Sequence, residues 1–455
     1  MLTRAGAGFG MLSLAGLLAK DAVASETRSS GLHFPARAKR CIFLFMNGGP
    51  SHVDTFDPKP ALSKYEGQEP GEQPEERVTK TSGFMPSPFR FQQHGQSGVV
   101  MSELLPNLAK HADDLCVLRS MHTDTANHEP GLLMMHSGNQ QPTRPCLGSW
   151  ASYGLGTENE NLPAFVSIAP GMPVVGPQLW SSAFLPANHQ ALAVNTKEMQ
   201  LESLVAHLRH PSLGRADQRT QLDFVQQLNR MHAAQRQADP DLEAHIQSME
   251  LAFKMQAEAT EAFDVSREPK HVVERYGDTP YANGCLLARR LLERGVRFVQ
   301  VYYVNKGKQP WDTHKDNDGG HRRLCADSDR ASAALISDLK ERGMLEDTLV
   351  IWGGEFGRTP YSENAKKGNS KPGRDHHATG FSMFLAGGGV RGGLMHGATD
   401  EFGMHAIEDR MHVHDLHATI LHLMGIDHER LTYRYSGRDF RLTDVFGRVA
   451  KEIIA

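Results

Sequence analysis

Residues 41–50 read CIFLFMNGGP, an apolar run that stops at an Asn-Gly-Gly-Pro turn. An apolar run without alternating polar residues is typical of a strand that is buried on both faces, as the strands of parallel sheets are. Three later stretches, 297–304 (RFVQVYYV), 348–352 (TLVIW) and 381–386 (FSMFLA), are also largely apolar. We therefore predict that these four segments form buried strands of one sheet.

Helical patterns lie between the predicted strands. Residues 331–342 and 415–424 have helical periodicity, and each stretch is followed by a glycine, which is a common helix C-cap. Strands that alternate with helices predict an α/β fold whose mostly parallel sheet is covered on both faces. Residues 218–263 differ, because they are rich in Gln, Ala, Glu, Arg and Met and are broken by an Asp-Pro pair. This stretch predicts a helical hairpin inserted in the sheet domain.

The composition is that of an ordinary soluble globular protein: 39% of the 455 residues are hydrophobic, 22% are charged, and the net charge is −4. This balance excludes a largely disordered chain and a protein with many membrane spans. Nucleic-acid-binding proteins normally carry a basic excess, which is absent here. The five cysteines form no C-x-x-C pair, which excludes a zinc ribbon, a disulfide framework and a thioredoxin-type site. The 24 histidines make metal chemistry the first function to test.

The first 24 residues predict an export signal. Arg4 precedes a short apolar run, and an Ala-Val-Ala cleavage site follows it, which is the order found in secretory signal peptides. The run is shorter than the ~20 residues of a membrane-spanning helix, so no stable transmembrane segment is expected in the mature chain. We expect residues 1–24 to be removed, 25–40 to be a linker, and 41–455 to form the folded domain. The predicted location is the periplasm or cell envelope, reached by a twin-arginine-like or general secretory route.

Polar residues gather where the predicted strands end. The clusters lie at 47–57 (NGGPSHVDTFD), 311–314 (WDTH), 353–359 (GGEFGRT) and 373–377 (GRDHH). In open α/β sheets, sites form in the crevice beyond the carboxyl ends of the strands. Carboxylate oxygens and imidazole nitrogens together bind Zn²⁺, Mn²⁺ or Fe. These clusters therefore predict a metal site assembled from several strand ends.

Two of the clusters carry the strongest candidate ligands. Asp312 and His314 are two residues apart, so on an extended segment both side chains point the same way. His376 and His377 are adjacent and would diverge on a strand, so we expect one of them to be a ligand. The other would contact the substrate or support the ligands.

Several motifs resemble those of sulfatases. The stretch 348–357 (TLVIWGGEFG) resembles the sulfatase segment in which an apolar strand leads to Asp-His-Gly, and 415–426 (DLHATILHLMGI) resembles a late sulfatase helix. The segments 105–108 (LPNL) and 125–138 (TANHEPGLLMMHSG) resemble the sulfatase helix and nucleophile loop. The chain is therefore similar to the alkaline phosphatase superfamily.

A closer resemblance is to a bacterial family of unknown function, the domain of unknown function 1501. It is carried by 47–59 (NGGPSHVDTFDPK), by the 311–314 motif and by 354–360 (GEFGRTP), and it spans about residues 41–445. The superfamily resemblance implies a three-layer αβα sandwich, an alkaline phosphatase-like sheet, a two-metal site and the hydrolysis or transfer of phosphate or sulfate esters.

The resemblance also implies roles for the clustered residues. Asp312 and His314 match ligands of one metal, completed by His376 or His377. The second metal site is altered, because Asn47 stands where the first strand of the superfamily carries Asp, and the Asp-His pair is replaced by Glu-Phe.

We expect His52 and Asp54 to rebuild this second site together with Glu355. His128 stands at the nucleophile position. The possible roles of its side chain are nucleophile, general acid, metal ligand or hydrogen-bond donor. A pair of arginines is expected to clamp the anion by parallel hydrogen bonds. These are Arg358 and Arg374.

The sequence thus favours an exported, metal-dependent hydrolase of phosphate or sulfate esters that acts on a small-molecule or glycan ester. Zinc is the first choice of divalent metal, with manganese, iron and calcium as alternatives. A second hypothesis is a non-catalytic relative that binds a sulfated or phosphorylated glycan or a protein partner in the cell envelope. A third is a purely structural envelope protein. The sequence leaves the oligomeric state open.

Overall fold

The computed structural model describes six stretches of the chain, which are residues 32–69, 81–205, 212–234, 240–305, 308–363 and 371–455. The predicted export signal at 1–24 and the first part of the predicted linker lie outside them. Residues 32–40, the described part of that linker, lie against the folded domain: the backbone N–H of Arg37 donates to the carbonyl oxygen of Leu423 at 2.8 Å. In the described stretches we find no helix with the length and apolar character needed to cross a membrane.

A nine-stranded sheet forms the centre of the fold, in the order β13-β5-β12-β9-β1-β8-β6-β7, with β16 also paired to β5. The strands β1, β8 and β9 pair in parallel, and β12 runs antiparallel to both of its neighbours, β5 and β9. The prediction of a mostly parallel sheet is confirmed. The bounds of the strands are β1 Arg40–Met46, β5 Leu115–His122, β6 Phe165–Ala169, β7 Leu192–Asn195, β8 Phe298–Tyr303, β9 Thr348–Gly353, β12 Phe381–Ala386, β13 Leu394–His396 and β16 Met411–His412.

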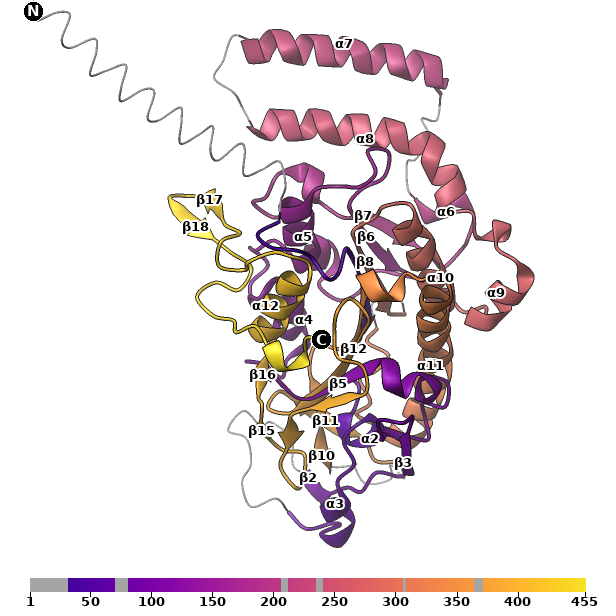
Figure 1. Cartoon of the computed structure of the whole chain (residues 1–455), viewed down its shortest axis with the longest axis vertical. Helices are drawn as coiled ribbons and strands as arrows, with labels where there is room; N and C mark the ends of the chain where they lie inside the picture. Colours follow the sequence, from indigo (N-terminus) through magenta and orange to yellow (C-terminus); the bar gives the residue numbers. More distant parts are fainter. Residues whose placement is uncertain (1–31, 70–80, 206–211, 235–239, 306–307, 364–370) are drawn as a thin grey trace, which may run out of the picture.

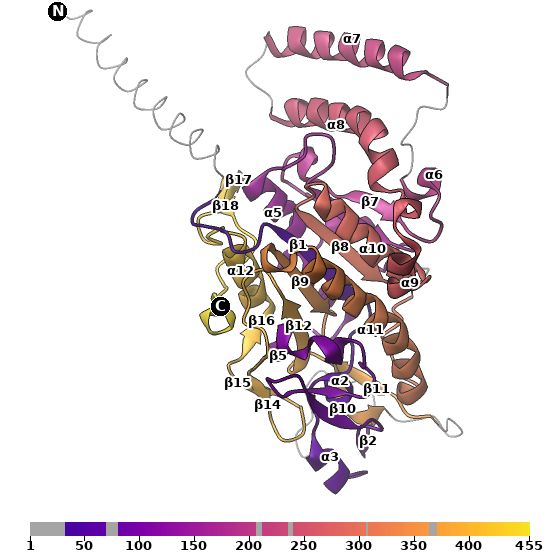
Figure 2. The same cartoon turned by 45° about the vertical axis from the view of Figure 1, so that its right-hand side comes forward.

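Helices cover both faces of the sheet, which gives the expected three layers (Figures 1 and 2). Alternate side chains of β1 enter two different cores, because successive residues of a strand point to opposite faces. Leu44 and Met46 pack in the core with α10 and α11, whereas Phe43 and Phe45 pack in the core with α4, α5 and α12. The bounds of these helices are α4 His128–Ser137, α5 Leu147–Leu155, α10 Pro280–Glu293, α11 Asn317–Glu341 and α12 Val413–Leu423.

Two long helices occupy most of the stretch for which a helical hairpin was predicted. They are α7 (Arg215–Ala234) and α8 (Pro240–Ala262). Figure 1 shows α8 lying between α7 and the sheet domain, with α7 outermost. An ion pair of 2.7 Å between Arg219 and Glu250 joins the two helices.

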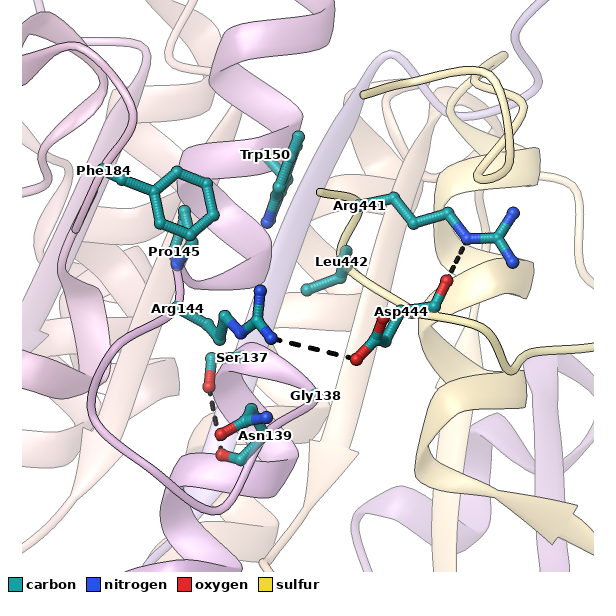
Figure 3. A pocket seen from close by; sticks show the side chains of 10 residues that line it. All are labelled: Ser137, Gly138, Asn139, Arg144, Pro145, Trp150, Phe184, Arg441, Leu442 and Asp444. Atoms are coloured by element: carbon teal, nitrogen blue, oxygen red, sulfur yellow. Dashed lines mark hydrogen bonds and ion pairs between the residues drawn. The ribbon is translucent and has the colours of Figure 1, made fainter. Parts of the chain in front are cut away.

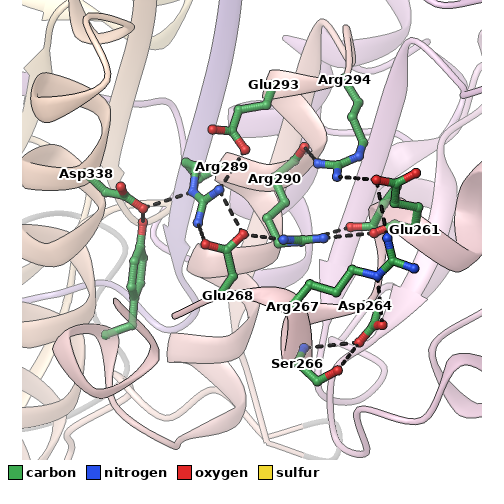
Figure 4. A network of polar contacts seen from close by, with 12 residues as sticks. Glu261, Asp264, Ser266, Arg267, Glu268, Arg289, Arg290, Glu293, Arg294 and Asp338 are labelled. Atoms are coloured by element: carbon green, nitrogen blue, oxygen red, sulfur yellow. Dashed lines mark hydrogen bonds and ion pairs between the residues drawn. The ribbon is translucent and has the colours of Figure 1, made fainter. Parts of the chain in front are cut away.

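A buried ionic network fastens the end of this hairpin to the α10–α11 layer (Figure 4). Glu268, just beyond α8, accepts hydrogen bonds from Arg289 at 2.6 Å and from Arg290. Arg289 is 1% exposed and also pairs with Asp338 of α11 at 2.9 Å. Each buried charge has an opposite partner, and removal of one partner would leave an uncompensated charge.

A small three-stranded sheet lies beside the carboxyl end of β9 and carries residues of the candidate site. Its central strand, β10 (Gly357–Glu363), pairs antiparallel with β11 (Arg374–His377) and with β2 (Thr81–Phe84). The strands β10 and β11 therefore place their residues near the edge of the large sheet where β1, β8 and β9 end.

Candidate metal centre

Three distant segments bring their side chains together at the carboxyl edge of the large sheet. His128 is the first residue of α4, where the extended residue Asn127 ends the loop from β5. Asp312 and His314 lie in the loop between β8 and α11, and His376 lies on β11. The structure therefore joins the predicted residues Asp312 and His314 to one of the two late histidines.

One oxygen of Asp312 is the common point of this cluster. Its Oδ1 lies 2.9 Å from His314 Nε2, 3.1 Å from His376 Nε2 and 3.3 Å from His128 Nε2. The Nε2 atoms of His314 and His376 are themselves 2.9 Å apart. Ligand atoms at the corners of a tetrahedron around Zn²⁺ are about 3.3 Å apart when the bonds are 2.0–2.1 Å. These distances are close to that value. His128, Asp312 and His376 form one group whose ligand atoms all lie within 4.8 Å of one another, and His314 and His376 form a second such group with Asp375, so the donor set fits a metal ion.

Two outer carboxylates orient the histidine rings. His128 Nδ1 donates to Glu355 Oε1 at 2.7 Å, and His314 Nδ1 donates to Glu363 Oε2 at 2.6 Å. We assign the proton to Nδ1 because a carboxylate can only accept it. A neutral ring then turns the lone pair of its Nε2 toward Asp312. Metal-binding histidines commonly have such a carboxylate on the other nitrogen.

The electrostatics of the cluster favour positive charge on His128 and His314, whereas burial lowers the pKa of His376. Burial alone would raise the pKa of Asp312, but its contacts with the three histidines and with Arg358 outweigh it and hold that pKa well below its usual range. The hydrogen bond with Asp312 raises the pKa of His314. For His128, burial acts downward, but the bonds to Asp312 and Glu355 prevail and raise its pKa. Converging lone pairs beside a carboxylate are stabilised only by protons or by a cation.

Two glycines let the backbone approach the site closely. Gly48, with φ of +113°, donates its N–H to both oxygens of Glu355 at 3.0 and 3.1 Å. A Cβ on Gly48 would lie 2.4 Å from Asp312 N, and a Cβ on Gly373 would lie 2.0 Å from the carbonyl carbon of His314. The Gly-rich turn after the first strand therefore fixes both Glu355 and the Asp312 loop.

The structure corrects the predicted second metal site of His52, Asp54 and Glu355. Among the described residues, no group of metal-binding side chains that meet within 4.8 Å includes any of these three. The short helix α2 (His52–Thr55) begins directly after the Gly-rich turn and buries its side chains beneath the neighbouring loops. His52 Nε2 donates to Gly403 O at 2.9 Å, and burial lowers the pKa of His52 to about 4.

His377 is also held away from the cluster. Its Nε2 donates to Met404 O at 2.6 Å, and its ring stacks on that of His52 with centroids 5.9 Å apart. His376 and His377 are neighbours on a strand and point to opposite faces, as their adjacency predicts. Only His376 reaches Asp312.

The two arginines that were predicted to clamp an anion both have carboxylate partners within the protein. Arg358 is 0% exposed, and its Nη2 donates to Asp312 Oδ1 at 2.7 Å. Arg374 is equally buried, and its Nε donates to Asp54 Oδ2 at 2.7 Å. Arg374 would leave the buried charge of Asp54 unpaired if it turned to a substrate. Arg358 instead balances part of the negative charge at the centre.

Sequence reasoning missed Glu363. Glu355 was expected to bind metal, and in the structure it contacts His128 Nδ1 and the N–H of Gly48. No sequence signal marks Glu363, since its role depends on the pairing of β10 with β11. Asn47 has a further unusual environment: it is fully buried, and neither atom of its amide has a hydrogen-bond partner among the described residues.

A separate cavity lies at the other end of α4 (Figure 3). Its polar lining is internally paired: Arg144 lies 3.9 Å from Asp444 and stacks over the ring of Phe440 at 4.2 Å. Because α4 rises about 1.5 Å per residue, its ten residues place His128 some 15 Å along the helix from this cavity. The cavity is therefore not part of the candidate metal centre.

The fold and the cluster together define an α/β protein with a candidate metal centre at the carboxyl edge of its sheet. Residues 38–454 match a family model described as a protein of unknown function (DUF1501), and the chain belongs to this family. The resemblance to that family is confirmed. A search of curated proteins found no match.

Solved structures with a similar fold include enzymes of the sulfatase and alkaline phosphatase type. Ps i-CgsB is 10% identical, with 85% of this chain and 72% of that chain covered and a TM-score of 0.38. The PsFucS1 sulfatase from Pseudoalteromonas sp. is 13% identical, with 86% and 69% covered and a TM-score of 0.35. Alkaline phosphatase from the Antarctic bacterium TAB5 is 11% identical, with 85% and 98% covered and a TM-score of 0.35.

Proposed function

We propose that this protein is a metal-dependent hydrolase of phosphate or sulfate esters that works with a single metal ion. The observation that carries the proposal is the convergence of three imidazole nitrogens on Asp312 Oδ1, with two of the rings fixed from behind by carboxylates. Among the described residues, His52, Asp54 and Glu355 belong to no group of metal-binding side chains within 4.8 Å, which supports confining the proposal to one ion.

Each residue of the cluster has a role in this proposal. The ion would be held by His128, His376 and Asp312, whose ligand atoms all lie within 4.8 Å of one another, with His314 beside them. Glu355 and Glu363 keep two of the rings oriented, so that Nε2 rather than Nδ1 faces the centre. A divalent ion in this position, with zinc the first choice, would polarise the ester and lower the pKa of water toward ~7.

His128 is better suited to bind metal than to attack the substrate. A nucleophilic imidazole needs an unobstructed nitrogen, whereas His128 Nε2 faces Asp312 and its side chain is 13% exposed. The opposite side of the cluster is more open, since the side chains of His314 and Asp312 are 31% and 28% exposed. We infer that a substrate approaches from the His314 side.

The test combines metal analysis with a turnover screen. The purified protein is expected to contain about one divalent ion per chain and to hydrolyse an aryl phosphate or an aryl sulfate. The variant His376→Gln should lose both properties, while His405→Gln, a change to an exposed histidine outside the cluster, should keep both. A metal-free wild-type protein would refute the proposal.

The non-catalytic alternative has one observation in its favour. Both arginines that were candidates to bind an anion, Arg358 and Arg374, are buried and paired with carboxylates. Tight metal binding without turnover on any ester would favour this alternative.

Export remains part of the proposal. It is supported by the signal-like order of residues 1–24. Amino-terminal sequencing of the protein from a cell-envelope fraction should then begin at Ser25, and a cytoplasmic protein that retains Met1 would contradict export.

A further inference from the structure

A second cleft, of about 480 Å³, opens at the carboxyl edge of the same sheet. Its walls come from the ends of three neighbouring strands: Pro170 follows β6, Lys197 follows β7, and Tyr303 ends β8. The start of α10 and one side of α11 complete it, and Figure 2 shows these two helices side by side across the sheet. The carboxyl ends of parallel strands are where α/β proteins bind ligands.

The charges that line this cleft are mainly positive and uncompensated. Lys197, Lys308 and Arg323 are exposed, and none of them has an ion pair or a side-chain hydrogen bond with a described residue. The acidic group in the lining is Asp327, which accepts hydrogen bonds from Thr279 at 2.6 Å and from Tyr303 at 2.9 Å. We call this feature the basic cleft. Three cations face solvent here although the whole chain carries a net charge of −4.

The floor of the basic cleft is held in place by ring and hydroxyl contacts. The rings of Tyr281 and Tyr303 contact each other with centroids 5.0 Å apart. Both hydroxyls are occupied, by Ser332 at 3.1 Å and by Asp327 at 2.9 Å. Pro280, the first residue of α10, adds a fixed backbone to the same floor. A cleft with such a floor is largely formed before a ligand arrives, which lowers the entropic cost of binding.

The same loop lines the basic cleft and supplies the metal centre. Asn305, Lys308 and Pro310 face the cleft, and the loop continues to Asp312. Two residues of chain span at most about 7 Å, so Pro310 and Asp312 are close neighbours. Trp311 between them is fully buried and packs against Tyr303, with ring centroids 6.0 Å apart.

We propose that the basic cleft binds an anionic group of the molecule whose ester reaches the metal centre, so that the substrate is a polyanion with two or more sulfate or phosphate groups. This inference rests on the proposed function. The cluster at Asp312 would act on one anionic ester while Lys197, Lys308 and Arg323 hold another. Charged donors of this kind form stronger hydrogen bonds with anions than neutral donors do.

Calorimetry with two probes tests the cleft independently of turnover. One probe is a heparin-derived sulfated tetrasaccharide and the other is inorganic tripolyphosphate, so the result also distinguishes a sulfated from a phosphorylated ligand. The cleft variant combines Lys197→Gln, Lys308→Gln and Arg323→Gln. The matched control combines Lys270→Gln, Arg410→Gln and Lys451→Gln, which removes the same charge from exposed positions elsewhere.

We expect the wild-type protein to bind at least one probe, and the cleft variant to bind it roughly tenfold more weakly or worse. The control variant should bind like the wild type. Equal affinity of the cleft and control variants, or no binding of either probe to the wild type, would overturn the proposal. If the cleft variant alone loses affinity while the wild-type protein has no esterase activity, the basic cleft stands and the hydrolase proposal fails.

Discussion

The Nε2 atoms of His314 and His376 lie 2.9 Å apart, and each faces the same oxygen of Asp312. If both rings carry their proton on Nδ1, the lone pairs of the two Nε2 atoms face each other and a carboxylate, an arrangement that a positive charge between them stabilises. A proton would relieve one contact, whereas a metal ion would relieve all of them at once. This relationship is the basis of the first three predictions.

Removal of the metal should destabilise the folded protein. An ion that binds the native state and not the unfolded state raises the free energy of unfolding by mass action. We expect dialysis against a chelator to lower Tm by about 5 °C or more, and added Zn²⁺ to restore it. Scanning calorimetry checks this, and identical Tm values with and without chelator would count against a metal centre.

Loss of the outer carboxylate Glu363 should weaken metal binding without abolishing it. Glu363→Gln keeps the size of the side chain but removes the charge that holds the proton on His314 Nδ1. We expect the metal affinity to fall roughly 10–100-fold. Competition with a fluorescent zinc chelator measures it. The control is Glu346→Gln, an exposed glutamate outside the cluster, and equal affinities for the two variants would remove Glu363 from the site.

His128→Ala distinguishes a ligand from a nucleophile. We expect this variant to lose metal and turnover together, because its Nε2 faces Asp312 and its Nδ1 is held by Glu355. A nucleophile would instead leave the metal content unchanged while turnover fell by several orders of magnitude. Metal analysis and kinetics on the same sample separate the two roles.

Asn47→Leu should not reduce stability. A buried amide without hydrogen-bond partners costs about 1–3 kcal/mol, and an apolar group of similar shape removes that cost. We expect the free energy of unfolding in urea to stay the same or rise. A clear loss of stability would mean that the Asn47 amide makes a stabilising contact.

Acid should destabilise the fold through buried neutral histidines far from the metal centre. Burial lowers the pKa of His417 to about 3 and that of His136 to about 4. The unfolded chain binds a proton at each below ~6.5 and the folded chain does not, so stability is lost as the pH falls. The loss is roughly 1.4 kcal/mol per pH unit for each group.

Urea unfolding at pH 7.5 and pH 5.0 measures this loss. His417→Gln removes one of the two groups, and its side chain amide can still donate to Met135 O, the present partner of His417. The variant should therefore show a smaller difference between the two pH values than the wild type. An unchanged difference would show that His417 does not contribute.

The fold could be predicted because its central strands are continuous apolar runs in the sequence. The run at 41–46 became β1 (Arg40–Met46), and the runs at 348–352 and 381–386 became β9 and β12. The antiparallel direction of β12 was not predictable, because an apolar run carries no information about strand direction.

The candidate site was only partly predictable. The spacing of Asp312 and His314 and the divergence of His376 and His377 follow from backbone geometry, and both appear in the structure. The positions of His52 and Asp54 could not be predicted in this way. A four-residue helix redirects side chains that would have faced the crevice on an extended chain. Which carboxylate pairs with which buried arginine depends on tertiary packing.

The separation of the cluster along the chain has a consequence for how the protein matures. Asp312 and His376 are 64 residues apart, and His128 and Glu355 are 227 residues apart. Such long loops must close before these side chains meet, so the centre should assemble late in folding. A chain that crosses a membrane unfolded would then acquire its metal outside the cytoplasm, whereas a chain exported already folded would carry the metal chosen inside the cell.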